Sequence, residues 1–374
     1  MTVATIGKPL STDDLHAILN GACILGCGGG GPLSLGSSLL TQIIQQGTVY
    51  LADPINDLPD DALTAIAAGV GSPLAASEGF PFDVASIAFK SLDDRQAAAS
   101  GKHFSFVLPA EVGAGNSIVP MTVAVKLGLP IIDADGARRA IPELDMVTYA
   151  SHNLPISPIV LANATQAITF YAPNPAVAGV TADGIISGGA FTEDAGISLW
   201  SMTGADVKAA AIPHTMSYAR DLGIALKQTL AEQKDPVEAV RAYLDGTVIF
   251  KGTIDSTSQT TEGGFDFGTL VLKNERGRLT IYNQNENLIA WSSLSPKPLA
   301  LAPDLICYLT TDGQPFTNAD LDLAQGKEIA VIAASCLPQM RVPAILDKFL
   351  KALKSLGYAG SYVPVEELLK GSVQ

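Results

Sequence analysis

The stretch that decides the fold runs from residue 104 to residue 135 and reads FSFVLPAEVGAGNSIVPMTVAVKLGLPIIDAD. The apolar runs Phe104–Leu108 and Leu129–Ile132 have the length of buried strands, and Ser117–Leu127 between them has helical spacing. A strand, a helix and another strand in succession predict neighbouring parallel strands. The strand-like run Leu63–Val70 and the helical pattern Phe82–Ala99 extend this alternation toward the N-terminus.

We therefore predict an α/β domain over residues 1–245, with a largely parallel sheet that carries helices on both faces. Its last helices are expected at Thr215–Glu232 and Pro236–Leu244. After Gly246 the sequence predicts a smaller β-rich domain over residues 246–340, followed by a helix and tail over 341–374 that pack back on the body. The β-rich runs are Thr247–Ile254, Phe267–Leu272, Leu279–Asn283, Leu288–Trp291 and Leu305–Leu309, with a hairpin turn at Asn274–Gly277.

The composition of the 374 residues excludes several classes of protein. Apolar residues make up 47% and charged residues 16%, which indicates a large core and excludes disorder. The net charge of −14 makes nucleic-acid binding unfavourable. The N-terminus has no signal-peptide pattern, and four prolines break the uncharged stretch 146–182, so we expect a cytoplasmic protein that does not enter a membrane. Four cysteines without a Cys-x-x-Cys pair fit reduced thiols.

A glycine-rich loop, Cys27–Pro32, precedes a helical pattern that begins near Leu33. Free backbone N–H groups at such a helix start can bind an anion, so Gly28, Gly29 and Gly30 are candidate substrate-binding residues. The alternative is a tight turn between helices in which only glycine allows a close backbone approach. Cys27 is either a thiol activated by the helix start or a small buried filler.

A second candidate loop, Glu111–Ser117, follows the strand Phe104–Leu108. Ligands of open parallel sheets bind beyond the carboxyl ends of the strands. Glu111 is therefore a candidate catalytic residue and Asn116 a candidate substrate ligand. The alternative is an ordinary loop in which Asn116 or Ser117 caps the next helix.

The densest group of charges, residues 133–145, follows the strand Leu129–Ile132. Asp133 and Asp135 are candidates for acid–base catalysis and are expected to lie near Glu111, because strand-end loops on one sheet edge converge. Arg138 or Arg139 is a candidate clamp for a substrate carboxylate. The alternative is a structural ion-pair network between domains or subunits.

Three further groups of polar residues are weaker candidates. Glu78 is a third strand-end acid, and Asn285 belongs to an amide run that suits either a cyclic amide or a turn. His152 and His214 are candidate ligands of a divalent metal, although their spacing carries no metal signature and each is otherwise a hydrogen-bonded core or cap residue.

Several segments taken in order resemble one family, the domain-of-unknown-function family 917, which is associated with S-methyl thiohydantoin desulfurase. The resemblance implies a two-domain cytoplasmic hydrolase-like protein, akin to companions of hydantoinases and oxoprolinases, which process five-membered cyclic amides. Ala114 and Arg138 stand where the family pattern leads us to expect glycine. The matching segments are Cys27–Pro32, Glu111–Ser117, Pro130–Leu144, Gly264–Gly268, Gln284–Leu288 and Pro303–Ile306.

The expected reaction is hydrolysis at the C2 carbon of a hydantoin or S-methyl thiohydantoin-like ring, with Asp133, Asp135 and Glu111 in acid–base roles. The alternative is a non-catalytic subunit or small-ligand-binding partner of a hydantoinase or oxoprolinase. Acids that converge on one pocket favour the enzyme, whereas acids that pair with arginines at an interface favour the subunit. The expected partners are a small-molecule substrate, a hydantoinase or oxoprolinase and a second copy of the chain, with no nucleic acid and no membrane.

Overall fold

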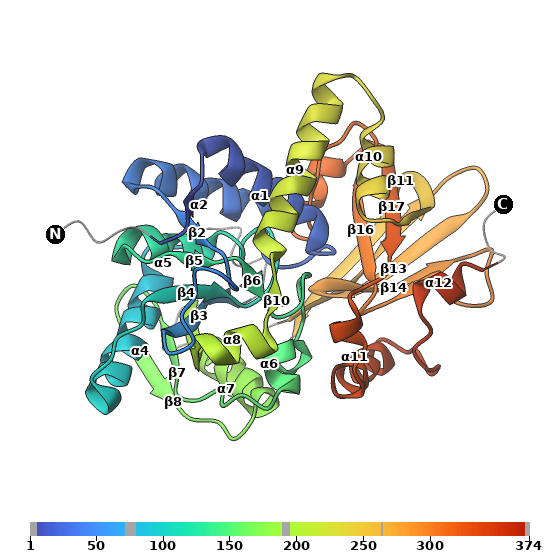
Figure 1. The fold of residues 1–374 in the computed structure, drawn as a ribbon. Coiled ribbons are helices and arrows are strands. Elements are labelled where there is room, and N and C mark those ends of the chain that lie inside the picture. The colour runs from blue at the N-terminus through green and yellow to red at the C-terminus, as the bar shows by residue number, and fades with distance from the viewer. Residues whose placement is uncertain (1–5, 72–79, 189–194, 263–264, 371–374) are drawn as a thin grey trace.

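The computed structural model describes residues 6–71, 80–188, 195–262 and 265–370, in which two large β-sheets lie side by side (Figure 1). A small two-stranded sheet pairs β6 (Ala134–Asp135) with β10 (Ile212–Pro213). The first sheet has eight strands in the order β1-β2-β5-β4-β3-β9-β7-β8. The second has seven, in the order β15-β14-β13-β12-β11-β17-β16. Within the described part of the chain, no helix is both long and apolar enough to cross a membrane.

The first sheet confirms the predicted parallel arrangement for its four central strands, β2, β5, β4 and β3. Antiparallel strands, which the sequence analysis did not assign, extend the sheet beyond β3 and at the β1 edge. The strands are β1 (Lys8–Pro9), β2 (Tyr50–Ala52), β3 (Leu63–Val70), β4 (Phe106–Pro109), β5 (Ile131–Ile132), β7 (Ile159–Ala162), β8 (Ala167–Phe170) and β9 (Ala195–Thr203).

Helices cover both faces of this sheet, as predicted. Ala65 and Ala67 of β3 pack on one face, whereas Ile66 and Ala68 pack on the other, because successive side chains of a strand point in opposite directions. The first face is covered by α1 (Thr12–Leu25), α2 (Leu33–Gln46), α4 (Val84–Ser100) and α5 (Val119–Leu127). The second is covered by α6 (Thr148–Ser151), α7 (Pro175–Ser187) and α8 (Gly204–Ala210).

The second sheet is antiparallel throughout and begins with the long strand β11 (Thr247–Glu262). The N-terminal part of β11 pairs with β17, and the rest pairs with β12. The turn between β12 and β13 lies at the predicted position, where the backbone N–H of Asn274 donates to the Gly277 carbonyl (3.1 Å). The other strands are β12 (Phe265–Lys273), β13 (Arg278–Gln284), β14 (Glu286–Ser292), β15 (Ala300–Leu301), β16 (Leu305–Thr310) and β17 (Ile329–Ala334).

The C-terminal helix α11 (Pro343–Ser355) packs between the two sheets. Its residues Ile345 and Phe349 share a core with Leu288 of β14 and with Met146 of the α/β part. The short elements of the chain are β6 (Ala134–Asp135), β10 (Ile212–Pro213), α12 (Val365–Leu368) and the 3-10 turns Leu144–Met146, Leu321–Ala324 and Pro338–Arg341.

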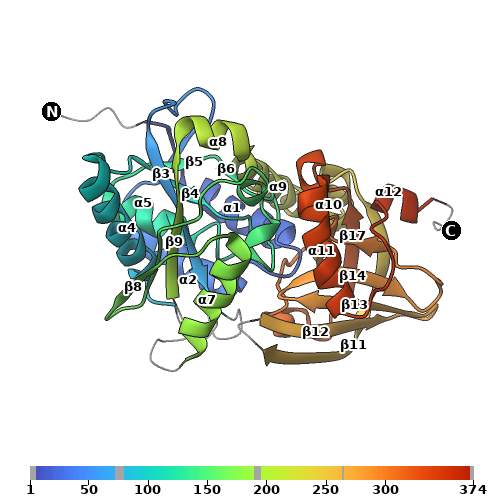
Figure 2. The ribbon, with the colours of Figure 1, turned by 90° about the horizontal axis from the view of Figure 1, so that it is seen from below.

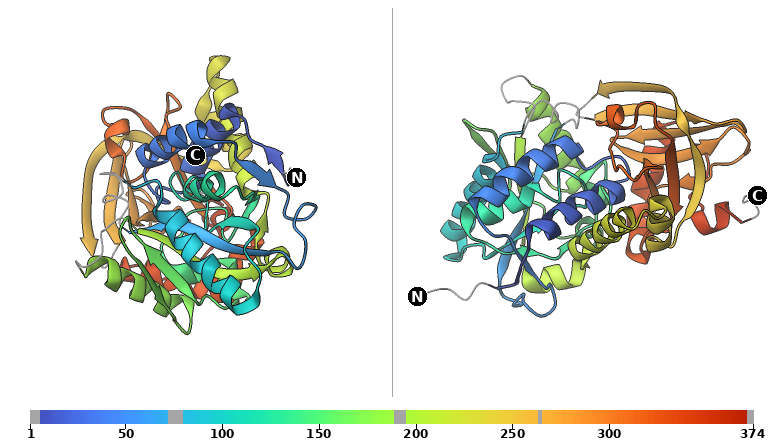
Figure 3. Two further views of the ribbon diagram at one scale, coloured as in Figure 1. Left: turned by 90° about the vertical axis from the view of Figure 1, so that its left-hand side faces the viewer. Right: turned by 90° about the horizontal axis from the view of Figure 1, so that it is seen from above.

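Helix α9 (Thr215–Ala231) leads from the first sheet toward the second, followed by α10 (Pro236–Tyr243), and it packs against α1 (Figures 1, 2 and 3). The two helices approach closely because glycines lie at their contact. A Cβ atom on Gly21 would lie 1.8 Å from the Ala219 carbonyl oxygen, and one on Gly223 would lie 2.0 Å from the Ala17 oxygen. Leu25 of α1 and Leu222 of α9 also share a core with β16, so apolar packing is continuous between the sheets.

We expect Gly21→Ala to lower the free energy of unfolding by about 1–3 kcal/mol, because the added methyl group must separate α1 from α9. This loss outweighs the intrinsic helix preference for alanine, which is about 1 kcal/mol. Urea denaturation of the purified protein measures the change.

Gly184→Ala is the matched control, because Gly184 lies in α7 with nothing within 4 Å of an added Cβ atom. This variant should be as stable as the wild type or slightly more stable. Equal effects of the two substitutions would show that the α1–α9 contact is not as tight as described.

Candidate functional site

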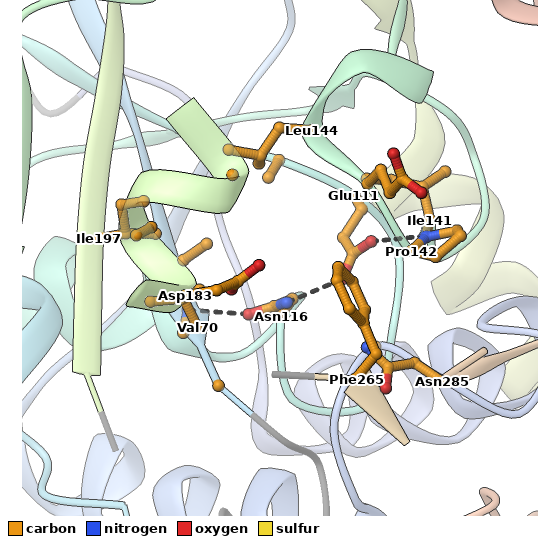
Figure 4. A pocket seen from close by; sticks show the side chains of 18 of the residues that line it. Val70, Glu111, Asn116, Ile141, Pro142, Leu144, Asp183, Ile197, Phe265 and Asn285 are labelled. Carbon is orange, nitrogen blue, oxygen red and sulfur yellow. Dashed lines mark hydrogen bonds between the residues drawn. The ribbon is translucent and has the colours of Figure 1, made fainter. Parts of the chain in front are cut away.

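A cavity of about 300 Å³ lies where the two sheets meet (Figure 4). The α/β part contributes the ends of β3 and β4, the loops that follow them, and α7. The β-rich part contributes Phe265, Asn285 and Glu286, and α11 contributes Lys351. The polar side chains of the lining are those of Glu111, Asn116, Glu143, Asp183, Asn285, Glu286 and Lys351.

Glu111 is fixed in this cavity by hydrogen bonds to both of its carboxylate oxygens. Asn116 donates its amide Nδ2 to Oε1 (2.7 Å), and the backbone N–H of Ile141 donates to Oε2 (2.7 Å). Asn116 is itself held by the N–H of Gly69, which donates to its Oδ1 (2.9 Å; Figure 4). Burial raises the pKa of Glu111 to about 7, against the lowering effect of these hydrogen bonds.

Glu286 faces the same cavity from the first position of β14. It is 2% exposed, and its Oε1 accepts a hydrogen bond from the backbone N–H of Gly30 (3.2 Å). Its Oε2 is buried and has no hydrogen-bond partner among the described residues. Burial, followed by the charge of Glu111, raises the pKa of Glu286 well above its usual value, which favours the protonated form of this carboxyl group.

The glycine-rich loop mainly holds Glu286 in place, and only part of it lines the cavity. Gly30 lines the cavity, whereas Gly28 and Gly29 lie outside its lining. A Cβ atom on Gly29 would lie 2.0 Å from Glu286 Oε1, so glycine is needed for the close approach. The first N–H of α2, on Leu33, donates to Asp320 Oδ2 (2.7 Å), so the chain supplies its own anion at this helix start.

Cys27, at the edge of this loop, is fully buried against the β-rich part. Its Sγ lies 3.8 Å from the Sγ of Cys307 in β16, and it is not part of the cavity lining. Burial acts to raise the pKa of the Cys27 thiol, but the hydrogen bond with Cys307 and the charge of Arg139 lower it overall to about 7. Both interpretations of Cys27, the activated thiol and the small buried filler, therefore stay predictions.

Arg139 is completely buried and joins the two halves of the molecule. Its guanidinium group donates to four backbone carbonyls, and it lies outside the cavity lining, as does Arg138. Arg138 instead stacks over the ring of Tyr218 (4.5 Å to the centroid). The structure therefore places neither arginine where it could clamp a substrate carboxylate in this cavity. The carbonyl partners of Arg139 are those of Ala140 (2.9 Å), Pro303 (2.9 Å), Asp304 (3.0 Å) and Asn287 (3.3 Å).

Asp133 and Asp135 also lie outside the lining of the cavity. Asp133 turns toward the start of α9, where it accepts hydrogen bonds from the N–H (2.9 Å) and the hydroxyl group of Ser217. Asp135 accepts the N–H of Arg138 on both oxygens (2.9 Å each), which stabilises a tight turn. Burial raises the pKa of Asp135 to about 7, and the charge of Glu111 adds to this effect, so the two loops do approach each other.

The candidate metal ligands lie apart from the cavity lining. His152 Nδ1 is 2.9 Å from the carbonyl oxygen of Thr148, and His214 Nδ1 is 3.6 Å from Asp133. The described residues contain no group of three or more His, Cys, Asp or Glu side chains that could hold a metal ion. Glu78 lies outside the described residues.

Three carboxyl groups of the cavity are not among the candidates from the sequence: Glu286, Asp183 and Glu143, of which Glu143 lies within the charged group 133–145. The signal for Glu286 is that it is the one acid in the amide run 283–287, directly beside the candidate Asn285. Asp183 belongs to α7, where burial followed by the charge of Glu143 raises its pKa to about 6. It is the first charged residue after the uncharged stretch that begins at Met146, which is the signal that could have drawn attention to it.

The fold and the site define a class of protein in which an α/β half and an antiparallel β half enclose an acidic cavity. Comparison with known families shows which family the chain belongs to. Models for the N-terminal and C-terminal domains of S-Me-THD-like proteins match residues 13–172 and 188–365, respectively. The chain belongs to this S-methyl thiohydantoin desulfurase-like family, as its motifs predict.

One solved structure supports the fold. A crystal structure of a protein from Chromobacterium violaceum is 29% identical in sequence and superimposes with a TM-score of 0.84. The match covers 96% of this chain and 100% of the other. No curated protein matches the chain.

We expect Arg139→Lys to destabilise the protein by about 2–4 kcal/mol, because lysine has too few donors to satisfy these carbonyls and leaves some of them buried without partners. Arg138→Lys is the adjacent control and should cost less than about 1 kcal/mol, because Arg138 loses only its stacking on Tyr218. Thermal and urea unfolding of both variants measure the difference. Equal stability of the two variants would contradict the role assigned to Arg139.

We also expect the free energy of unfolding to fall as the pH rises from about 4.5 to about 7. In this range the folded protein holds a proton on Glu111 that the unfolded chain has lost, so raising the pH favours unfolding. Glu111→Gln should reduce this slope, whereas the exposed acid Glu275, changed to Gln, should leave it unaltered. Urea unfolding at a series of pH values tests this, and an unchanged slope in Glu111→Gln would contradict it.

Proposed function

We propose that the protein is a hydrolase of a five-membered cyclic amide of the hydantoin or S-methyl thiohydantoin type, with water attacking the C2 carbon of the ring. The observation that carries the proposal is the pair Glu111 and Glu286. The two carboxyl groups come from the two halves of the chain, face one cavity, and form no ion pair with an arginine in the part of the chain that the structure describes. This arrangement favours the enzyme over a non-catalytic subunit.

The two carboxyl groups suit opposite roles in this reaction. Glu111 has a pKa of about 7, so a large fraction is ionised at neutral pH and can accept a proton from water. The raised pKa of Glu286 favours its protonated form, and its Oε2 has no partner among the described residues, so it can donate a proton or a hydrogen bond to a bound ring. Environments that separate two carboxyl groups in this way are typical of acid–base catalysis.

The proposed steps conserve every proton. Glu286 protonates the ring nitrogen beside C2, while water adds to C2 and gives a proton to Glu111. The C2–S bond then breaks, the departing sulfur takes the proton from Glu111, and the new hydroxyl group returns a proton to Glu286 as it becomes a carbonyl. The products are a ring with C2=O and a free thiol, and both carboxyl groups are restored.

The remaining polar residues have supporting roles in this proposal. Asn116 is a positioning residue, because its amide group is occupied by Glu111 and Gly69. Asn285 accepts the Asp266 N–H on Oδ1 (2.8 Å), and its Nδ2 group makes no hydrogen bond with the described residues. That group can donate to a ring carbonyl, which is one of the two roles expected for the amide run; Asn285 also takes the other role, because it forms the turn between β13 and β14.

The test is methanethiol release from an S-methyl thiohydantoin, with ring opening of a hydantoin as a second assay. We expect Glu286→Gln to lower kcat by about 100-fold or more, because glutamine keeps the shape and a donor but has no acidic proton. KM should change little. Glu111→Gln should show a comparable loss, together with loss of the acidic limb of the pH profile near 7.

Asp93→Asn is the control, since Asp93 is also a buried carboxylate but lies on α4, outside the cavity lining. This variant should retain wild-type kcat. Wild-type activity in Glu286→Gln, or the absence of turnover by the wild type on either ring, would refute the proposal.

A further inference from the structure

The cavity contains a second pair of carboxyl groups that the proposed chemistry does not use. Asp183 extends from α7 into the cavity beside Val70 and Ile197, on the side opposite Glu111 and Phe265 (Figure 4). Glu143 also lines the cavity, and its charge acts on Asp183. The carboxylate of Asp183 is partly buried, and no hydrogen bond or ion pair holds it among the described residues.

The described lining supplies less positive than negative charge. Of the residues described, the lining contains four acids, and its one cation is Lys351, which is exposed to solvent. Lys348 is on the same helix but forms an ion pair with Asp145 (2.9 Å). The segments outside the described residues contain no Lys, Arg or His. An anionic ligand would therefore meet repulsion, whereas a cation would gain a partner.

One further feature indicates that the cavity holds a ligand, and another indicates that part of this ligand is apolar. Glu286 Oε2 is a polar atom without a partner in a residue that is 2% exposed, so the cavity is incomplete when empty. The wall near Asp183 is apolar and includes Val70, Ile197 and Leu199. An aliphatic chain fits such a wall. The partly buried carboxylate of Asp183, which lies beside the wall, is costly without a partner.

Building on the function proposed above, we propose that the substrate carries a cationic group on a short aliphatic arm. The ring lies against Glu111 and Glu286, the arm lies along the apolar wall, and an ammonium or guanidinium group lies between Asp183 and Glu143. The cavity thereby selects against rings that carry a carboxylate, in contrast to the arginine clamp expected from the sequence.

The experiment compares three hydantoins that differ only at the end of the C5 arm: aminobutyl, pentyl and carboxybutyl. Isothermal titration on the full chain should give at least 10-fold tighter binding of the aminobutyl compound than of the pentyl compound, and the weakest binding for the carboxybutyl compound. Asp183→Asn should reduce the preference for the amine by about 10-fold. It should leave the affinity for the pentyl compound within 2-fold, which excludes misfolding as the cause.

Glu275→Gln removes an acid outside the cavity lining and should leave the preference unchanged. Equal binding of the amine and pentyl compounds, or an unaltered preference in Asp183→Asn, would overturn the inference. Thermal stabilisation by Mg²⁺ or Ca²⁺ alone that is lost in Asp183→Asn would also overturn it, since the acids would then form a metal site.

The binding data also separate this inference from the proposed function. Charge-selective binding without turnover of the thiohydantoin analogues would refute the hydrolase and leave the cationic site standing. Turnover of a pentyl-substituted thiohydantoin with no gain from the amine would leave the hydrolase standing and refute the cationic site.

Discussion

The buried guanidinium group of Arg139 is the interaction on which the arrangement of the two halves depends. It extends from the α/β half and binds the carbonyls of Asn287, Pro303 and Asp304 in the β-rich half. Asn287 directly follows Glu286, so the same contacts fix the position of Glu286 relative to Glu111. Arg139 binds carbonyls and pairs with no carboxylate among the described residues, so its positive charge opposes the rise in the pKa of both glutamates.

The pKa values of Glu111 and Glu286 depend on the balance between burial, which raises them, and the charge of Arg139, which lowers them. Glu111 receives two hydrogen bonds and keeps a pKa near neutrality, whereas Glu286 receives one at Oε1 and has a partnerless Oε2. The surroundings alone thus raise the pKa of two residues of the same type to different extents. Glu111 has one backbone donor and one side-chain donor, from Asn116, whereas Glu286 has only the backbone N–H of Gly30 among the described residues, so fewer hydrogen bonds oppose the rise in its pKa.

The sequence predicts the parallel strands and the Glu111 loop because both follow from local patterns and from the rule for strand ends. It does not predict the direction of the Asp133 side chain, because Asp133 binds Ser217 at the start of α9, a residue that is distant in sequence. Glu286 escapes prediction for a similar reason, since its partner Gly30 lies 256 positions away. Asp183 is missed because an isolated acid on a helix has the same local pattern as an ordinary solvent-facing residue.

The division of the cavity between the two halves also bears on how the protein is made. Ile24 and Leu25 of α1 leave the ribosome long before Leu305 and Leu309 of β16, the residues with which they share a core. Until those strands are synthesised, the glycine-rich loop has no Glu286 to bind and α2 has no Asp320 at its first turn. The nascent α/β half therefore carries an exposed apolar surface through most of translation, which is the period when a chaperone would protect it from aggregation.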